Sequence, residues 1–204
     1  MRALLTAIAL VAAPGVHHTA AGTAAAQHAL LRHADLGGPW ITGTTPKKIG
    51  ALSCEFPTES AGVVEIGAAV SPTYREGAAG PFLSQSVFVY DSSAGAARFY
   101  QEFARPSALD CLSRSITSSG EAGQSVVFTV SKRQALPTPK VGVPAAAYRV
   151  VGRAVVKAQR VTIYVDVVLL QRGSNISQLN FSSFSASVAA ADELRIARAA
   201  ADHL

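Results

Sequence analysis

Residues 145–184 constrain the fold most, because they contain three consecutive stretches of β-strand pattern with almost no interruption. In the middle stretch every second residue is large and apolar, at Val161, Ile163, Val165, Val167 and Leu169. Thr162, Tyr164 and Asp166 lie between them, and a side-chain period of two places the two sets on opposite faces of a sheet. This pattern predicts a strand with one face in the core.

The flanking stretches extend this strand into a predicted antiparallel meander. Residues 172–175 (Arg-Gly-Ser-Asn) are typical of a turn, because Gly and Asn tolerate positive φ. A shorter β-rich stretch follows, with Ile176, Leu179 and Phe181. Upstream, residues 148–151 and 155–156 predict a further strand.

The rest of the chain predicts helices and strands that cover or extend this meander. Helical patterns occur over residues 29–36, 94–104 and 108–112 and after Ser187, and further strands are expected at residues 63–70, 85–90 and 126–130. The sequence therefore predicts an α+β fold with an antiparallel sheet of about six strands and helices packed on it.

Length and composition favour a single folded domain. A chain of 204 residues, 49% of them apolar and 15% charged, can bury one sizeable core and is not disordered in general. No apolar stretch approaches the roughly 20 residues that a membrane span needs. Lys and Arg are scattered and not gathered into a basic stripe, so we expect no nucleic-acid binding.

Residues 1–26 have the features of a cleaved signal peptide. Arg2 gives a positive start, residues 3–12 are apolar, and residues 24–26 are three alanines before Gln27. An uncleaved membrane anchor is the alternative, but the apolar stretch is too short for one. No cysteine lies near the cleavage site, which argues against a lipid anchor. We therefore expect a secreted domain of residues 27–204.

Cys54 and Cys111 are the only cysteines, an even number in a chain expected to enter an oxidising compartment. We predict that they form a disulfide. A redox or metal-binding role is the alternative, but there is no Cys-x-x-Cys pattern and no histidine at ligand spacing beside either cysteine.

No catalytic, metal-binding or cofactor-binding motif occurs in the chain. The nucleophile elbow, the phosphate loop, the dinucleotide fingerprint and the zinc-protease motif are all missing. After removal of residues 1–26 only His28, His33 and His203 remain. We therefore expect no enzymatic activity, no metal and no cofactor.

Three groups of residues, in order, resemble the PknH-like extracytoplasmic sensor domain of actinobacteria. They are residues 30–37 before Trp40, residues 94–103 followed by Leu109-x-Cys111, and the turn within residues 167–175. The resemblance implies an antiparallel sheet with helices around a cleft that binds a ligand. This chain differs from the kinase-attached form in having one cysteine pair instead of two and no kinase domain. The family supplies no catalytic residues.

We therefore expect a secreted sensor-like domain of the cell envelope that binds a small molecule or an envelope fragment. Aromatic and polar side chains typical of such sites make five residues the candidates: Trp40, Tyr148, Tyr164, Asp166 and Arg172. Trp40 as a core plug and Asp166 as an outward polar residue are the structural alternatives. A protein-interaction module that uses a sheet face or edge is the alternative function, and a secreted hydrolase is a third.

Overall fold

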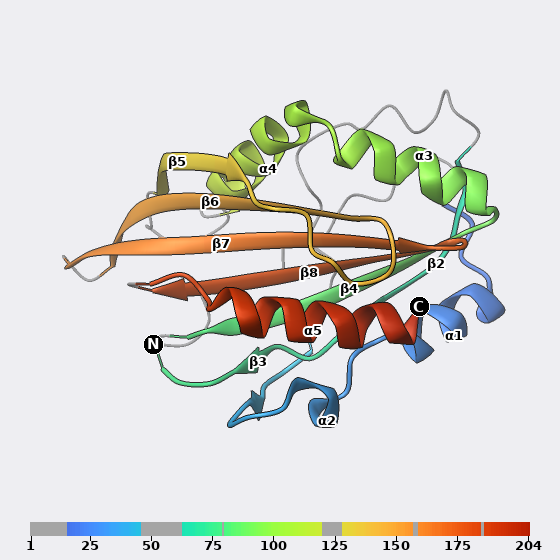
Figure 1. Ribbon diagram of the computed structural model, residues 1–204, viewed down its shortest axis with the longest axis horizontal. Coiled ribbons are helices and arrows are strands. Elements are labelled where there is room, and N and C mark those ends of the chain that lie inside the picture. Colours follow the sequence, from blue (N-terminus) through green and yellow to red (C-terminus); the bar gives the residue numbers. More distant parts are fainter. Residues whose placement is uncertain (1–15, 46–62, 79, 120–127, 157–158, 185) are drawn as a thin grey trace.

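The computed structural model describes residues 16–45, 63–78, 80–119, 128–156, 159–184 and 186–204, and it forms an antiparallel sheet with helices on both faces (Figure 1). The strands are β1 (Ile41–Thr42), β2 (Glu65–Val70), β3 (Tyr74–Arg75), β4 (Phe82–Tyr90), β5 (Phe128–Ala135), β6 (Ala145–Val156), β7 (Gln159–Arg172) and β8 (Asn175–Phe184). The helices are α1 (Ala20–His28), α2 (His33–Leu36), α3 (Ser93–Phe103), α4 (Pro106–Ser119) and α5 (Ala190–His203).

The sheet has the strand order β1-β3-β4-β8-β7-β6-β5, with β2 also paired to β4. Strands β6, β7 and β8 are the predicted meander, and long β6–β7 and β7–β8 ladders hold it together. The α+β class is confirmed, but the sheet has eight strands instead of about six. β1 and β3 have two residues each, which is too short for periodicity to reveal.

The two faces of the sheet carry separate layers of helix. α3 and α4 cover one face, where Phe99, Phe103 and Leu112 pack against apolar residues of β4, β6, β7 and β8. α5 covers the other face, where Ile196 and its neighbours pack against β7 and β8 (Figure 1). We call these the α3/α4 face and the α5 face. Because the sheet is covered on both sides, polar residues in its central strands become buried.

Helices α3 and α4 largely follow the prediction. Ser92 caps α3 by accepting a hydrogen bond from the Gly95 backbone N–H at 3.1 Å, which satisfies one of the free N–H groups of the first turn. α4 begins at Pro106, where the missing N–H costs nothing. The helix predicted over residues 29–36 is reduced to α2. The helix predicted after Ser187 is α5, which starts after Ala189 and has no side-chain cap.

Part of the segment predicted as a signal peptide packs against the fold. Residues 16–26 were assigned to a signal peptide outside the fold, yet His17 and Thr19 donate backbone hydrogen bonds to the carbonyls of Glu65 and Ile66. α1 follows and packs on β2 and β4, with Ala26 fully buried. The alanines that resemble a cleavage site are also the small residues that let a helix approach a sheet closely. Cleavage of a leader stays a prediction, and residues 1–15 lie outside the described part.

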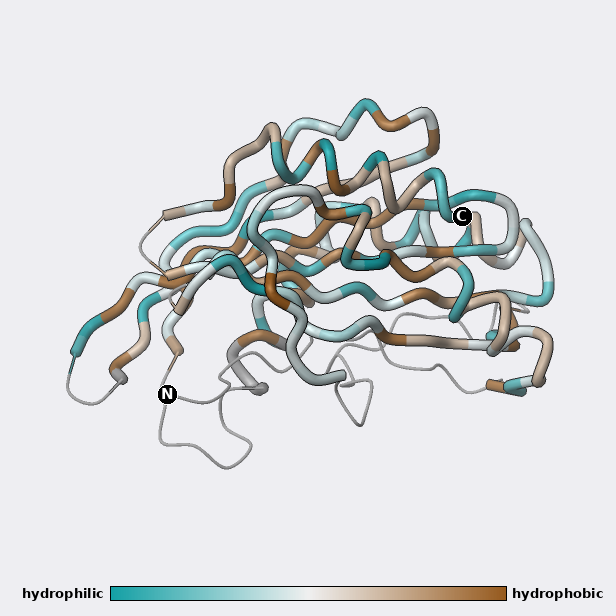
Figure 2. The backbone as a smooth tube through the Cα atoms, turned by 90° about the horizontal axis from the view of Figure 1, so that it is seen from below, coloured by the Kyte–Doolittle hydropathy of each residue, from teal (hydrophilic) through white to brown (hydrophobic). Residues whose placement is uncertain are grey.

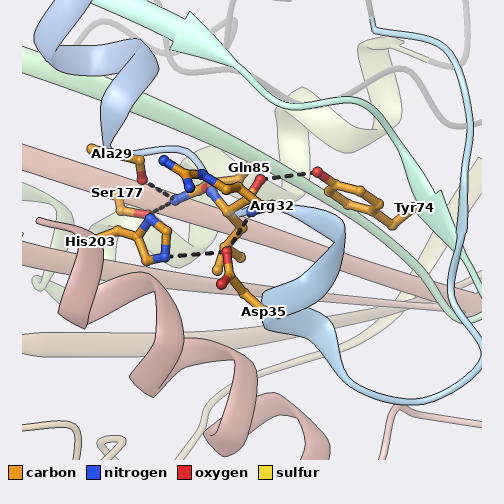
Figure 3. Close-up of polar contacts among 8 residues, drawn as sticks. Ala29, Arg32, Asp35, Tyr74, Gln85, Ser177 and His203 are labelled. Atoms are coloured by element: carbon orange, nitrogen blue, oxygen red, sulfur yellow. Dashed lines mark hydrogen bonds and ion pairs between the residues drawn. The ribbon is translucent and has the colours of Figure 1, made fainter.

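Gln85 holds the link between α1 and α2 onto the sheet (Figure 3). Its side-chain oxygen accepts from the Leu31 backbone N–H at 2.6 Å, and its nitrogen donates to the Ala29 carbonyl and the Ser177 hydroxyl. Gln85 is fully buried, so each of these bonds forms away from water. Within the described ranges no helix is long and apolar enough to cross a membrane.

Candidate functional site

A group of buried polar side chains crosses the two central strands β4 and β8 on the α3/α4 face. Ser84 lies opposite Asn180, and Ser86 lies opposite Gln178. Ser182 continues the group one pair further along β8. Because side chains two residues apart share a face, these five side chains form one continuous patch. We call this patch the polar tract; it consists of Ser84, Ser86, Gln178, Asn180 and Ser182.

The polar tract lies where an apolar core is expected. Ser86 is completely buried and Asn180 is 8% exposed. On the neighbouring strand β7, the residues beside the tract are Val165, Val167 and Leu169, which belong to the core of the α3/α4 face. The polar side chains therefore interrupt a hydrophobic layer, which costs free energy unless each polar atom finds a hydrogen bond.

The tract contains polar atoms that have no hydrogen-bond partner among the groups that the structure describes. The Ser86 hydroxyl Oγ and the Asn180 amide Nδ2 are among them. The Asn180 oxygen, in contrast, accepts a hydrogen bond from the Gln178 amide at 2.7 Å. A buried unpaired polar group costs about 1–3 kcal/mol, and native proteins keep few of them. The tract thus holds one amide donor and one hydroxyl whose hydrogen-bonding capacity is unused among the described groups.

Two half-buried aromatic rings lie at one end of the tract. Phe82 and Phe184 occupy the same face as the tract residues, and their ring centroids are 6.0 Å apart in an edge-to-face arrangement. Aromatic side chains beside a few convergent polar groups are the usual composition of a small-molecule site. No described charged side chain belongs to the tract or to this aromatic pair. The composition therefore favours an uncharged ligand.

None of the tract residues was predicted as a site residue, although the sequence contains a signal. β4 carries Ser-Gln-Ser and β8 carries Ser-Gln-Leu-Asn in the middle of otherwise apolar and aromatic strands. A central strand covered on both faces is expected to be nearly continuously apolar. The signal became readable only once the topology placed β4 beside β8, because the strands are separated by more than 80 residues of sequence.

Two of the five predicted residues, Tyr164 and Asp166, lie together on the α5 face. Arg149 of β6 is directly opposite Asp166 and donates two hydrogen bonds to its carboxylate, at 2.5 and 2.7 Å. Asp166 is 1% exposed, so it is neither an outward polar residue nor free to bind a ligand. Glu193, in the first turn of α5, completes this charged cluster at 3.6 Å from Arg149 Nη2.

Burial shapes the protonation of this cluster. Loss of water around Glu193, together with the neighbouring Asp166 carboxylate, raises the pKa of Glu193 to about 9, although Arg149 opposes the shift. The bond to Asp166 raises the pKa of Arg149. At neutral pH Glu193 therefore keeps its proton beside the Arg149–Asp166 ion pair. Its geometry indicates a clamp between α5 and the meander.

The other three predicted residues do not join this pair. Tyr148 lies on the opposite face, where its hydroxyl donates to the Phe103 carbonyl at 2.9 Å. Trp40 is 4% exposed within the core beside α2, which agrees with its role as a core plug. Arg172 lies exposed at the β7–β8 turn. The five residues are thus dispersed over both faces, and ligand binding by them as one site has no support in their placement.

Cys111, the described member of the predicted disulfide, lies on α4. It is 5% exposed and packs in the core of the α3/α4 face. Cys54 lies outside the described residues, so the pairing stays a prediction. Among the described residues, no group of three or more His, Cys, Asp or Glu side chains could hold a metal ion.

The chain has a distant likeness to a solved structure. No protein-family model matches the chain, and no curated protein matches it. Among solved structures, the chain is similar to the extracellular domain of PknH from Mycobacterium tuberculosis, with 11% identity and a TM-score of 0.44. The match covers 87% of this chain and 93% of that domain. The ligand-binding cleft that the sequence resemblance implies stays a prediction.

Proposed function

We propose that this protein is a non-enzymatic, sensor-like domain that binds a small, uncharged polar molecule at the polar tract. The observation that carries the proposal is the pair of unpartnered buried atoms, Ser86 Oγ and Asn180 Nδ2, in a patch with no charged side chain. A ligand that bears hydroxyl or carbonyl groups would satisfy both atoms. The rings of Phe82 and Phe184 would contact its apolar face.

Three of the five described histidines make contacts within the fold, which favours a binding role over catalysis. His18 contacts the Glu65 carboxylate, His203 contacts Asp35, and the His33 ring bonds to the Trp40 carbonyl. All three contacts tie the N-terminal segment or α2 to the rest of the fold. Export to the cell envelope, which the features of residues 1–26 predict, is part of the same proposal.

The test compares ligand response with stability in Ser86→Ala. The probes are uncharged polyols, namely glucose, maltose and myo-inositol, and the measurement is the rise in melting temperature of the wild-type protein with probe concentration. A ligand of the native state alone stabilises it by about 2.7 kcal/mol at a hundred times its Kd. We expect Ser86→Ala to lose the response to the probe that stabilises the wild type.

Without ligand, Ser86→Ala should leave the free energy of unfolding unchanged or raise it by up to about 1 kcal/mol, because it removes an unpaired buried hydroxyl. Ser177→Ala is the matched control, since this buried serine on the other face of β8 bonds to Gln85. The control should lose stability and keep the ligand response. A loss of more than about 1 kcal/mol in Ser86→Ala would mean that the hydroxyl is a structural group, against the proposal.

A further inference from the structure

The β6–β7 hairpin projects beyond the rest of the sheet, as Figures 1 and 2 both show. Near its end, on the α5 face, α5 no longer covers the strands. Arg153 and Arg160 are exposed there, and so is Lys132 of the edge strand β5. Val155 shares this face and is 49% exposed, one of the two exposed large apolar side chains in the described part of the chain. We call these four residues the hairpin surface: Lys132, Arg153, Val155 and Arg160.

The basic side chains of the hairpin surface are not neutralised by described acidic side chains. No described acidic side chain forms an ion pair with Lys132, Arg153 or Arg160. On strands β5, β6 and β7 the one described acidic side chain is Asp166, which is already paired with Arg149, and Glu193 of α5 beside it is buried with a raised pKa. The surface therefore presents net positive charge around one exposed apolar residue.

We infer that the hairpin surface binds the surface of a membrane that contains anionic lipids. Basic side chains near such a surface are attracted to its headgroups, and an exposed apolar side chain gains by entering the headgroup region. The projecting hairpin extends past the end of α5, so the helix does not cover this part of the sheet (Figure 1). A second copy of the chain is a poor occupant, because two net positive surfaces would repel each other. The proposal is independent of the ligand proposed above, which lies on the α3/α4 face.

The expected binding is weak and sensitive to salt. Each Lys or Arg near an anionic surface strengthens binding about fivefold, and the attraction acts within a Debye length of about 8 Å at physiological ionic strength. Three basic residues therefore give peripheral, reversible attachment.

The experiment is co-sedimentation of the full chain with vesicles. Vesicles of phosphatidylglycerol and phosphatidylcholine should bind the protein, and vesicles of phosphatidylcholine alone should not. Arg153→Gln combined with Arg160→Gln should weaken binding about 25-fold. The matched control, Arg75→Gln combined with Lys140→Gln, removes two exposed basic residues outside the hairpin surface and should bind like the wild type apart from a small effect of net charge.

Substitution of the exposed Val155 distinguishes a lipid surface from a soluble acidic protein as the binding partner. Val155→Ser should weaken vesicle binding and leave binding to soluble poly-glutamate unchanged. If the hairpin and control double variants lose vesicle binding equally, the attraction depends only on the net charge of the protein. That result would overturn the proposal. Poly-glutamate binding as tight as vesicle binding, with no effect of Val155→Ser on either, would assign the surface to an acidic protein instead. A melting curve for each variant confirms that these exposed substitutions leave the fold intact.

Discussion

Gly22 of α1 and Gly67 of β2 meet backbone against backbone. A Cβ atom added to Gly67 would lie 2.1 Å from the Gly22 carbonyl carbon, and one added to Gly22 would lie 2.2 Å from the Ile66 carbonyl oxygen. Both positions therefore exclude any side chain while α1 stays in place. The contact brings the helix close enough to bury Ala26 completely.

Gly67→Ala should displace α1 from β2. Overpacking of this kind costs about 1–3 kcal/mol, measured as a lower free energy of unfolding in urea. Gly77→Ala is the control, because its new Cβ would meet its nearest neighbour, the Gly80 carbonyl oxygen, at an ordinary 3.6 Å. Equal stability of Gly67→Ala and the control would show that α1 does not pack on β2 in solution.

The same contact predicts where the folded unit begins. A chain of residues 16–204 should keep the melting temperature of the full chain, while a chain of residues 27–204 should melt at a lower temperature, because it lacks most of α1 and the His18–Glu65 contact of 2.7 Å. If a leader is cleaved on export, we expect mass spectrometry to find the mature N-terminus before His17. A mature protein that begins at Gln27 and keeps full stability would support the boundary after residue 26 that the sequence predicts.

The central meander could be predicted from the sequence, whereas the packing of α1 could not. The alternation of Val161 to Leu169 and the turn at Gly173 identify the meander, because periodicity and turn chemistry are local signals. α1 was missed because its alanines fit a cleavage site as well as a tightly packed helix. Choosing between the two depends on Gly67, which lies more than 40 residues away in sequence.

The candidate site was harder to predict than the fold. Tyr164 and Asp166 were singled out as aromatic and charged residues, but the sequence could not place Arg149 opposite Asp166. It could not show that α5 brings Glu193 to the same place either. The polar tract depends likewise on β4 lying beside β8. Site prediction fails here because each site is made by pairing distant strands, whereas single strands can be recognised one at a time.

The charged cluster under α5 predicts an unusual dependence of stability on pH. The pKa of Glu193 is about 9 in the folded protein and about 4.3 in an unfolded chain. Between these values only the folded state holds the proton, so the free energy of unfolding should fall as pH rises from about 5 to about 9. The slope from one such group is at most about 1.4 kcal/mol per pH unit.

Glu193→Gln tests this dependence, because an amide keeps the neutral shape and cannot ionise. The variant should show a flatter pH profile of stability than the wild type, with its advantage largest near pH 9. Asp192→Asn is the control, since Asp192 lies in the same turn but is half exposed. If Glu193→Gln is less stable than the wild type at pH 8 and keeps the slope, Glu193 is ionised in the folded protein.

The predicted disulfide gives the last test. A bond between Cys54 and Cys111 would close a long loop, and the loop-entropy model gives about 4 kcal/mol for it, a large share of a typical domain stability of 5–15 kcal/mol. Cys54→Ala and reduction of the wild type should therefore lower the melting temperature by similar amounts, and reduction should have no further effect on the variant. Cys111→Ala should cost more than Cys54→Ala, because Cys111 also packs in the core of the α3/α4 face. Two free thiols in the denatured, unreduced wild-type protein would contradict the pairing.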